Sequence, residues 1–216
     1  MAKTALIIGA TGLVGEQCLN ELLGSKEYEK VIALTRKKHE IRNAKYENIV
    51  TDFENLEAIA QQLKADDVFC SMGTTIAKAG SKAAFTKVDY TIPIKVAELT
   101  KQNGAKNFIL VSSIGADASS LIFYSKTKGE LENALMKLNF ESLIILRPSI
   151  LLGNRKEKRF GEEVGRIAAE KLSFLFVGAL KKYKGTPVDL LGKLMVKLAQ
   201  EKSTGVRIIE NEEIMK

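Results

Sequence analysis

The 216-residue sequence contains no tryptophan, one histidine and two cysteines. Two cysteines cannot form a disulfide framework. Because Cys18 and Cys70 each lie inside an apolar segment, we interpret both as small buried hydrophobic residues of a protein in a reducing compartment. The only histidine, His39, lies just beyond a basic stretch, and we expect it at the surface rather than in catalysis. No metal site is predicted.

Long hydrophobic runs are also missing. No stretch approaches the roughly 18 consecutive apolar residues that a membrane helix needs. The apolar run before the first glycine, Ala5–Ile8, is too short for the core of a signal peptide and no cleavage site follows it. These absences lead us to expect no membrane association and a cytoplasmic location.

Positive charge is in excess, but the basic residues are not clustered along the sequence. The net charge is +7. The basic runs Arg155–Arg159 and Lys181–Lys184 are short and are interrupted by Glu157 and Tyr183. Nucleic-acid binding usually needs clustered basic residues interleaved with aromatics. We therefore expect a lysine-rich solvated surface and no nucleic-acid partner, although a positive field favours an anionic cofactor.

Short apolar runs alternate with amphipathic helical patterns along most of the chain. Such alternation predicts βαβ units in a doubly wound parallel sheet, an α/β fold. The predicted strands are Ala5–Ile8, Val31–Leu34, Ile49–Val50, Asp67–Cys70, Phe108–Val111, Ser142–Leu146 and Val206–Ile209. Helices are expected after the first glycines, from Asp52–Glu57 onward, over Thr91–Asn103 and over Tyr124–Leu138.

The pattern loosens after Pro148. We expect one domain over residues 1–216, in which residues 153–216 add a small substrate-side or lid region. Leu172–Leu180 fits a pocket lid, an interface or a core helix equally well. Thr186 is the predicted N-cap of a last helix that has Pro187 at its first position. The predicted buried stripe of that helix consists of Leu190, Leu191, Leu194, Met195 and Leu198.

Three of the sixteen glycines fall within seven residues, in the stretch IIGATGLVGE. Gly9, Gly12 and Gly15 follow the first strand directly and lead into an amphipathic helix. Glycine permits a tight turn and a close approach of backbone to a ligand, and the amides at a helix start attract an anion. This context favours a dinucleotide pyrophosphate site, to which Thr11 could add a hydroxyl. The alternative is a tight strand–helix turn without a ligand.

The second strand ends in the basic residues Arg36, Lys37 and Lys38. A site selective for NAD usually has a carboxylate here to bind the ribose 2′-hydroxyl. A guanidinium suits a 2′-phosphate instead, so Arg36 favours NADP. The alternative is a solvated basic loop.

The stretch LVSSIGADASSLIFYSKTKGELE contains the residues best suited to chemistry. Ser112 and Ser113 end the fifth strand, and Tyr124 and Lys128 share one face of the next helix at a four-residue spacing. An ammonium near a phenol favours proton transfer to or from an alcohol or carbonyl. The hydroxyl of Ser113 would stabilise charge on the substrate oxygen.

Taken together, these motifs resemble the short-chain dehydrogenase/reductase family in its extended and atypical branches. The chain is most similar to the Tat-interacting-protein-type oxidoreductases, which have the NAD(P)-binding Rossmann fold. The motifs that carry this similarity are GATGLVG, CSMGTT, VSSIGAD, YSKTKGELE and LRPSILLG. The resemblance implies Ser113, Tyr124 and Lys128 as the catalytic set. The cofactor-binding residues that it implies are Gly9, Thr11, Gly12, Leu13, Val14 and Gly15 at the pyrophosphate, Arg36 at the 2′-phosphate, Asp52 and Phe53 beside the adenine, Gly73 and Thr74 after the fourth strand, Lys128 at the nicotinamide ribose, and Pro148, Ser149 and Ile150 near the nicotinamide.

From these residues we expect an NADP(H)-dependent oxidoreductase that transfers hydride to or from a small carbonyl or alcohol. NAD is the less favoured cofactor. One alternative is an NADPH-binding regulatory module that contacts a protein partner and has little turnover. Another is an epimerase or dehydratase acting on a nucleoside-diphosphate sugar. The sequence leaves the substrate open, and both a monomer and a homodimer are compatible with it.

Overall fold

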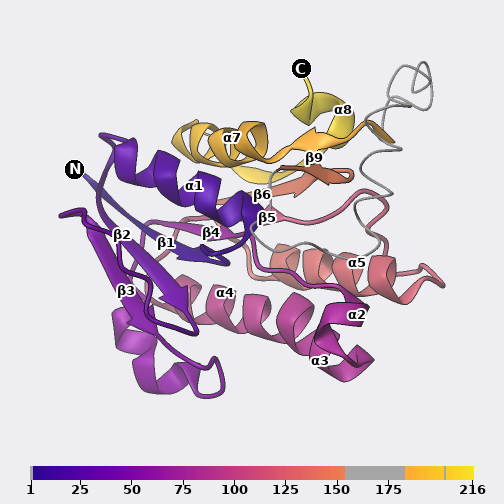
Figure 1. Cartoon of the computed structure of the whole chain (residues 1–216), viewed down its shortest axis with the longest axis horizontal. Coiled ribbons are helices and arrows are strands. Elements are labelled where there is room, and N and C mark those ends of the chain that lie inside the picture. Colours follow the sequence, from indigo (N-terminus) through magenta and orange to yellow (C-terminus); the bar gives the residue numbers. More distant parts are fainter. Residues whose placement is uncertain (1, 154–182, 202) are drawn as a thin grey trace.

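Seven parallel strands of the described residues form one sheet (Figure 1). The computed structural model describes residues 2–153, 183–201 and 203–216. The strands are β1 (Lys3–Ile8), β2 (Tyr28–Thr35), β3 (Tyr46–Val50), β4 (Asp67–Cys70), β5 (Asn107–Val111), β6 (Ser142–Arg147) and β9 (Gly205–Glu210). They lie in the order β3-β2-β1-β4-β5-β6-β9, so the direction of winding reverses between β1 and β4. Sheets of this kind bind ligands at the carboxyl ends of the strands beside this switch point.

Helices cover both faces of the sheet (Figure 1). Helices α1 (Leu13–Gly24) and α7 (Val188–Gln200) pack on one face, and α4 (Ile92–Gln102) and α5 (Phe123–Lys137) pack on the other. The short elements are the 3₁₀ helix Leu56–Gln62, α2 (Ile76–Ala79), α3 (Lys82–Thr86), a π-helical turn at Lys87–Thr91, β7 (Leu151–Leu152), β8 (Thr186–Pro187) and α8 (Asn211–Ile214). This is the predicted doubly wound α/β fold.

The continuous apolar run of β1 is explained by two separate cores. Ala5 and Ile7 join the core beneath α1 and α7, whereas Leu6 and Ile8 join the core beneath α4 and α5. Successive side chains of a strand point to opposite faces, so a strand covered on both sides must be apolar throughout. Each predicted strand is present in the structure.

The chain after β3 differs from the prediction. The helix expected from Asp52–Glu57 onward begins only at Leu56, where the Asn55 side chain accepts a hydrogen bond from the Ala58 amide. Asp52 lies in the preceding loop and accepts the Glu54 amide at 2.9 Å. This local hydrogen bond competes with helix formation, which explains the later start.

The start of α7 also differs. Thr186 and Pro187 form β8, which pairs with β7, and Pro187 is the N-cap of the helix in place of Thr186. Leu191, Met195 and Leu198 are buried as predicted, but Leu190 is 37% exposed and lies outside the buried stripe. The predicted runs Arg155–Arg159 and Leu172–Leu180 lie outside the described residues.

Candidate functional site at the carboxyl edge of the sheet

The glycine loop connects β1 to α1 at the switch point. Gly9 has a φ of +84°, a left-handed conformation that glycine adopts without strain. A Cβ at Gly15 would lie 2.0 Å from the Gly9 carbonyl oxygen. The first turn of α1 therefore packs directly against the loop, and a side chain at Gly15 would push the two apart.

The start of α1 offers unpaired backbone donors. Gly12 caps the helix without a side-chain hydrogen bond. Within the described part of the chain, the amides of Leu13, Val14 and Gly15 have no backbone acceptor. Free amides at the positive end of a helix dipole bind phosphate well. The loop therefore fits the pyrophosphate of a dinucleotide, with exposed Thr11 beside it.

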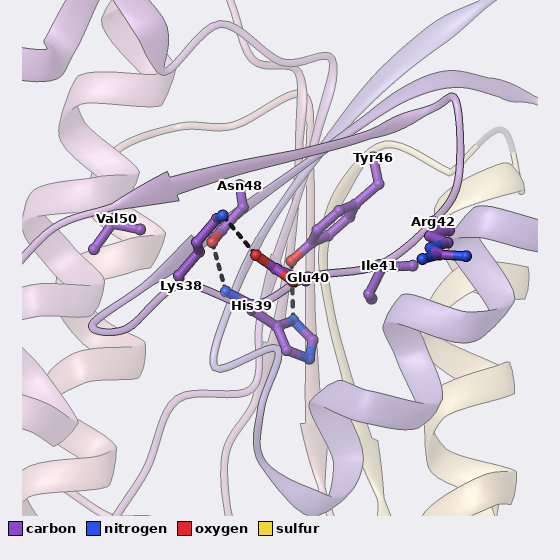
Figure 2. A pocket seen from close by; sticks show the side chains of 8 residues that line it. All are labelled: Lys38, His39, Glu40, Ile41, Arg42, Tyr46, Asn48 and Val50. Carbon is purple, nitrogen blue, oxygen red and sulfur yellow. Dashed lines mark hydrogen bonds and ion pairs between the residues drawn. The ribbon is translucent and has the colours of Figure 1, made fainter.

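A shallow pocket of about 510 Å³ lies beyond β2, along the edge strand β3 (Figure 2). It is lined by Lys38, His39, Glu40, Ile41, Arg42, Tyr46, Asn48 and Val50. It contains neither Tyr124 nor Lys128, so it is separate from the predicted catalytic residues.

Residues that line this pocket form hydrogen bonds that fix the chain that follows β2. In Figure 2, Asn48 and Tyr46 point from β3 toward His39. The Asn48 Oδ1 accepts the His39 amide at 2.9 Å, and the His39 Nδ1 and the Tyr46 hydroxyl share a hydrogen bond of 2.9 Å. Asn48 also donates to Thr35, the last residue of β2. These contacts fix both ends of the basic segment that includes Arg36, whose own side chain is exposed. His39 is half-buried and has a structural partner.

At the end of β3, Asp52 is exposed and Phe53 is buried. Phe53 has a φ of +64°, and its amide donates to the Thr51 hydroxyl at 3.1 Å. A left-handed phenylalanine is unusual, and such strain concentrates at functional positions. The strain makes this turn a candidate functional position, and its role beside the adenine stays a prediction.

The two serines after β5 face different surroundings. Ser112 is buried, and its hydroxyl donates to the Glu132 carboxylate at 2.5 Å. Ser113 is half-buried, and within the described residues its hydroxyl makes one hydrogen bond, a long one of 3.4 Å to the Ile114 carbonyl. Between these two serines, Ser113 is the one whose hydroxyl remains available for a substrate.

Tyr124 and Lys128 lie in the first two turns of α5. The ammonium of Lys128 is 6.0 Å from the centre of the Tyr124 ring, and the ring packs on Phe85 at 5.6 Å. Lys128 is 3% exposed, and its Nζ lies 3.6 Å from where a Cβ of Gly73 would be. The side chain of Lys128 therefore ends beside Gly73, the glycine that follows β4.

Asp89 is a residue of the site that the sequence analysis missed. It is fully buried and lies 2.7 Å from the Lys128 ammonium, and its other oxygen accepts the Thr74 amide at 2.8 Å. Burial has the largest single effect on the pKa of Lys128 and lowers it. The charge and hydrogen bonding of Asp89, together with Tyr124 and Cys70, outweigh burial, so the pKa is raised above its usual value. No local motif around Asp89 indicates this contact, because its partners come from two distant segments.

A second missed residue, Asn211, supports the loop after β6. Asn211 is fully buried and its Oδ1 accepts both the Ser149 amide at 3.2 Å and the Thr186 hydroxyl at 2.5 Å. The neighbouring loops are also joined, since the Ile114 amide donates to the Pro148 carbonyl at 2.9 Å. Residues from the C-terminal end therefore hold the predicted nicotinamide loop, of which Ile150 is exposed.

The fold thus gathers most predicted residues at the carboxyl ends of β1, β4, β5 and β6. Contacts join Gly73, Thr74 and Lys128 through Asp89. Arg36, Asp52 and Phe53 follow β2 and β3, farther toward the edge of the sheet. No hydrogen bond joins the side chains of the described residues Ser113 and Tyr124 in this structure.

Residues 9–167, more than half of the chain, match the NAD(P)H-binding family. The chain belongs to this family. Protein HTATIP2 of Rattus norvegicus is 41% identical over 168 residues, which cover 76% of this chain and 69% of that protein. The mitochondrial protein FMP52 of Candida albicans is 37% identical over 210 residues, which cover 94% of this chain and 90% of that protein. The resemblance to the Tat-interacting-protein type is confirmed.

Solved structures show the same fold. UDP-glucose 4-epimerase of Thermotoga maritima, with UDP-glucose, has a TM-score of 0.70 at 18% identity and covers 96% of this chain and 76% of that one. The oxidoreductase ylbE of Lactococcus lactis has a TM-score of 0.67 at 19% identity and covers 98% of this chain and 95% of that one. At these identities the likeness concerns the fold alone.

The expectation of a cytoplasmic location was wrong. FMP52 proteins that are 35% to 42% identical to this chain are named mitochondrial. The expectation depended on the lack of an apolar leader, but mitochondrial targeting segments are amphipathic and arginine-rich rather than apolar. Separately, no helix among the described residues is long and apolar enough to span a bilayer.

Proposed function

We propose that the protein is an NADP(H)-dependent oxidoreductase that transfers hydride to or from a small carbonyl or alcohol. The observation that carries this proposal is the placement of buried Lys128 beside Gly73, with the Tyr124 ring next to the lysine, at the same sheet edge as the free amides of α1. The proposed site lies in one domain, whose residues 153–216 add the substrate side.

The chain's own residues supply binding and proton transfer. The Leu13, Val14 and Gly15 amides hold the pyrophosphate, and the turn at Asp52 and Phe53 lies beside the adenine. When bound, the dinucleotide would supply a hydride at its nicotinamide for reduction of a carbonyl, or accept one in oxidation of an alcohol. The Tyr124 phenol gives a proton to the substrate oxygen or takes one from it, Lys128 orients the nicotinamide ribose, and Ser113 donates a hydrogen bond to the same substrate oxygen.

Arg36 supports the choice of NADP over NAD. It follows β2 at the position where a carboxylate would bind a 2′-hydroxyl, and its side chain is exposed and able to reach a phosphate. The hydrogen bonds through Asn48 fix the adjoining chain without using the guanidinium. A basic residue on a fixed backbone suits a 2′-phosphate.

Titration with NADPH and with NADH tests this proposal. The fluorescence of the reduced nicotinamide is followed directly, and the lack of tryptophan keeps the background low. We expect NADPH to bind at least about tenfold more tightly than NADH, the equivalent of one charge-assisted hydrogen bond, and Arg36→Asp to reverse this order. Lys37→Asp is the matched control, because it places the same charge one residue away.

Turnover is tested separately, with a panel of aldehydes and ketones and the variant Tyr124→Phe. Tight binding of neither nucleotide would contradict the proposal as a whole. Tight NADPH binding without turnover of any carbonyl would favour a regulatory module instead. NAD⁺ retained through purification would favour an epimerase or dehydratase.

A further inference from the structure

The buried ion pair of Lys128 and Asp89 joins two helical segments that are far apart in the sequence. Lys128 is 3% exposed and Asp89 is fully buried, with 2.7 Å between the Nζ and the Oδ1. A buried ammonium is strongly unfavourable unless an anion lies beside it. In the part of the chain that the structure describes, the other titratable groups that face Lys128 are Tyr124, on the same helix, and Cys70, on β4. Asp89 therefore supplies the compensating charge.

The carboxylate of Asp89 also reaches the loop after β4. Its Oδ2 accepts the amide of Thr74 at 2.8 Å, and its Oδ1 lies 3.4 Å from where a Cβ of Gly73 would be. One side chain thus contacts both the predicted catalytic lysine and the predicted cofactor loop. An ion pair whose only role was to join two helices would not require the hydrogen bond from the Thr74 amide.

The backbone at Asp89 is itself irregular. A π-helical turn, Lys87–Thr91, interrupts the helical run between α3 and α4. A π turn re-aims the side chains that it contains and is frequent at functional sites. Here the turn contains the carboxylate that is directed at Lys128.

We propose that Asp89 is a positioning residue that holds the Lys128 ammonium in place and charged, and holds the Gly73–Thr74 loop beside it. The inference deepens the proposed function and rests on it, since the ribose of the nicotinamide is the group that Lys128 would bind. Asp89 acts through Lys128 and Thr74 and does not itself touch the substrate.

A specific pH dependence follows from this role. With Asp89 present, Lys128 remains charged well into the alkaline range. In Asp89→Asn the size of the side chain is retained but the compensating charge is lost, and burial then lowers the pKa of Lys128. The ammonium is therefore lost as the pH rises, and with it the hydrogen bond to the ribose.

The experiment compares two probes, NADPH and adenosine 2′,5′-bisphosphate, which lacks the nicotinamide half. In Asp89→Asn we expect NADPH binding about tenfold weaker than in the wild type near pH 9 and within about threefold near pH 6, as expected for loss of one charge-assisted hydrogen bond. The bisphosphate should bind within about twofold of wild type at both pH values, because it does not reach Lys128.

Asp67→Asn is the matched control. Asp67 is equally buried and pairs with Lys3 at 3.1 Å, but it lies at the amino end of β4, away from the site. It should lower stability without changing the affinity for NADPH at either pH. If Asp89→Asn does not fold, Lys128→Met replaces it and should weaken NADPH binding by a similar factor at all pH values.

Two results in Asp89→Asn would overturn the inference. One is an NADPH affinity in Asp89→Asn that parallels the wild type from pH 6 to pH 9, and the other is an equal loss of both probes. Wild-type affinity for NADPH in Lys128→Met would do the same. All three differ from failure of the proposed function, in which the wild type itself binds neither NADPH nor NADH.

Discussion

At the scale of single residues, the glycine loop depends on the lack of a side chain at one position. Gly15 is in the first turn of α1, and the carbonyl oxygen of Gly9 occupies the place that a Cβ would take. The same contact brings the amides of α1 to the sheet edge. Close packing and anion binding therefore have one cause, and one methyl group would disturb both.

We expect Gly15→Ala to lower the free energy of unfolding by about 2 to 3 kcal/mol, because the added methyl group overpacks backbone that cannot move aside. NADPH affinity should fall as well. Urea unfolding and the nucleotide titration measure the two effects. Gly24→Ala is the control on the same helix, since nothing lies within 4 Å of that Cβ. It should stabilise the protein by about 0.5 kcal/mol, and an equal loss in both variants would contradict the packing argument.

At the scale of elements, α5 connects the site to the rest of the sheet. Tyr124, Lys128 and Glu132 follow one another at four-residue intervals and therefore share a face. Glu132 is buried and accepts from Ser112, and its carboxylate binds Arg147 at 2.6 Å. Arg147 also pairs with Glu210 of β9 at 2.8 Å. This network ties α5 to β5, β6 and β9, and it raises the pKa of Arg147.

Glu132→Ala should lower the free energy of unfolding by about 3 kcal/mol, because it removes the buried partner of Arg147 and leaves the Ser112 hydroxyl unpaired. Thermal or urea unfolding measures the loss. Glu213→Ala is the control, because it removes a similar carboxylate–guanidinium pair in which both side chains are more than 40% exposed. Its cost should be below about 1 kcal/mol. Comparable costs in the two variants would show that the network has no special stabilising role.

At the scale of the whole molecule, the two ends of the sheet have different roles. The carboxyl ends hold the candidate site. Near the amino ends, Asp67 accepts from Lys3, Tyr28 and Asn107 and joins neighbouring strands. Between them lies an apolar interior that contains both cysteines, each fully buried. Ionisable groups inside this interior link stability to pH.

We expect stability to fall as the pH rises from about 9 to about 11. Burial raises the pKa of Cys70 from 9.0 to about 11, and it also raises those of Cys18 and Tyr28. A group whose pKa is higher in the folded state keeps its proton there, so its contribution is complete below the unfolded value and is lost above it. For Cys70 the loss at pH 11 is roughly 2 kcal/mol.

Urea unfolding at successive pH values measures this slope. In the variant with both Cys18→Ala and Cys70→Ala, the decline between pH 9 and pH 11 should be much shallower, whatever the stability of that variant at pH 7. An unchanged slope would show that neither thiol is kept protonated by burial. The wild-type thiols should also resist alkylation until the protein unfolds, because the thiolate is the reactive form.

The sequence by itself determined the sheet and the order of its elements, and it predicted most of the residues that the structure brings to the carboxyl edge. Continuous apolar runs such as Ala5–Ile8 identify strands covered on both faces, and the glycines and the Tyr124–Lys128 spacing are local patterns that directly reflect local geometry. The start of the helix after β3 was missed, because the Asp52 side chain competes for the backbone. The exposed position of Leu190 was missed, because helical periodicity does not give the angle at which α7 meets α1.

Only the tertiary structure revealed Asp89, Asn211 and the separate surroundings of Ser112 and Ser113. Asp89 is 39 residues from Lys128 in the chain, and Asn211 is 62 residues from Ser149. The local sequence around a polar residue in a helix or after a strand does not show whether its side chain is buried against a partner or exposed to solvent. Burial and charge compensation are properties of the assembled elements, so the contacts that hold the site together were decided by the fold.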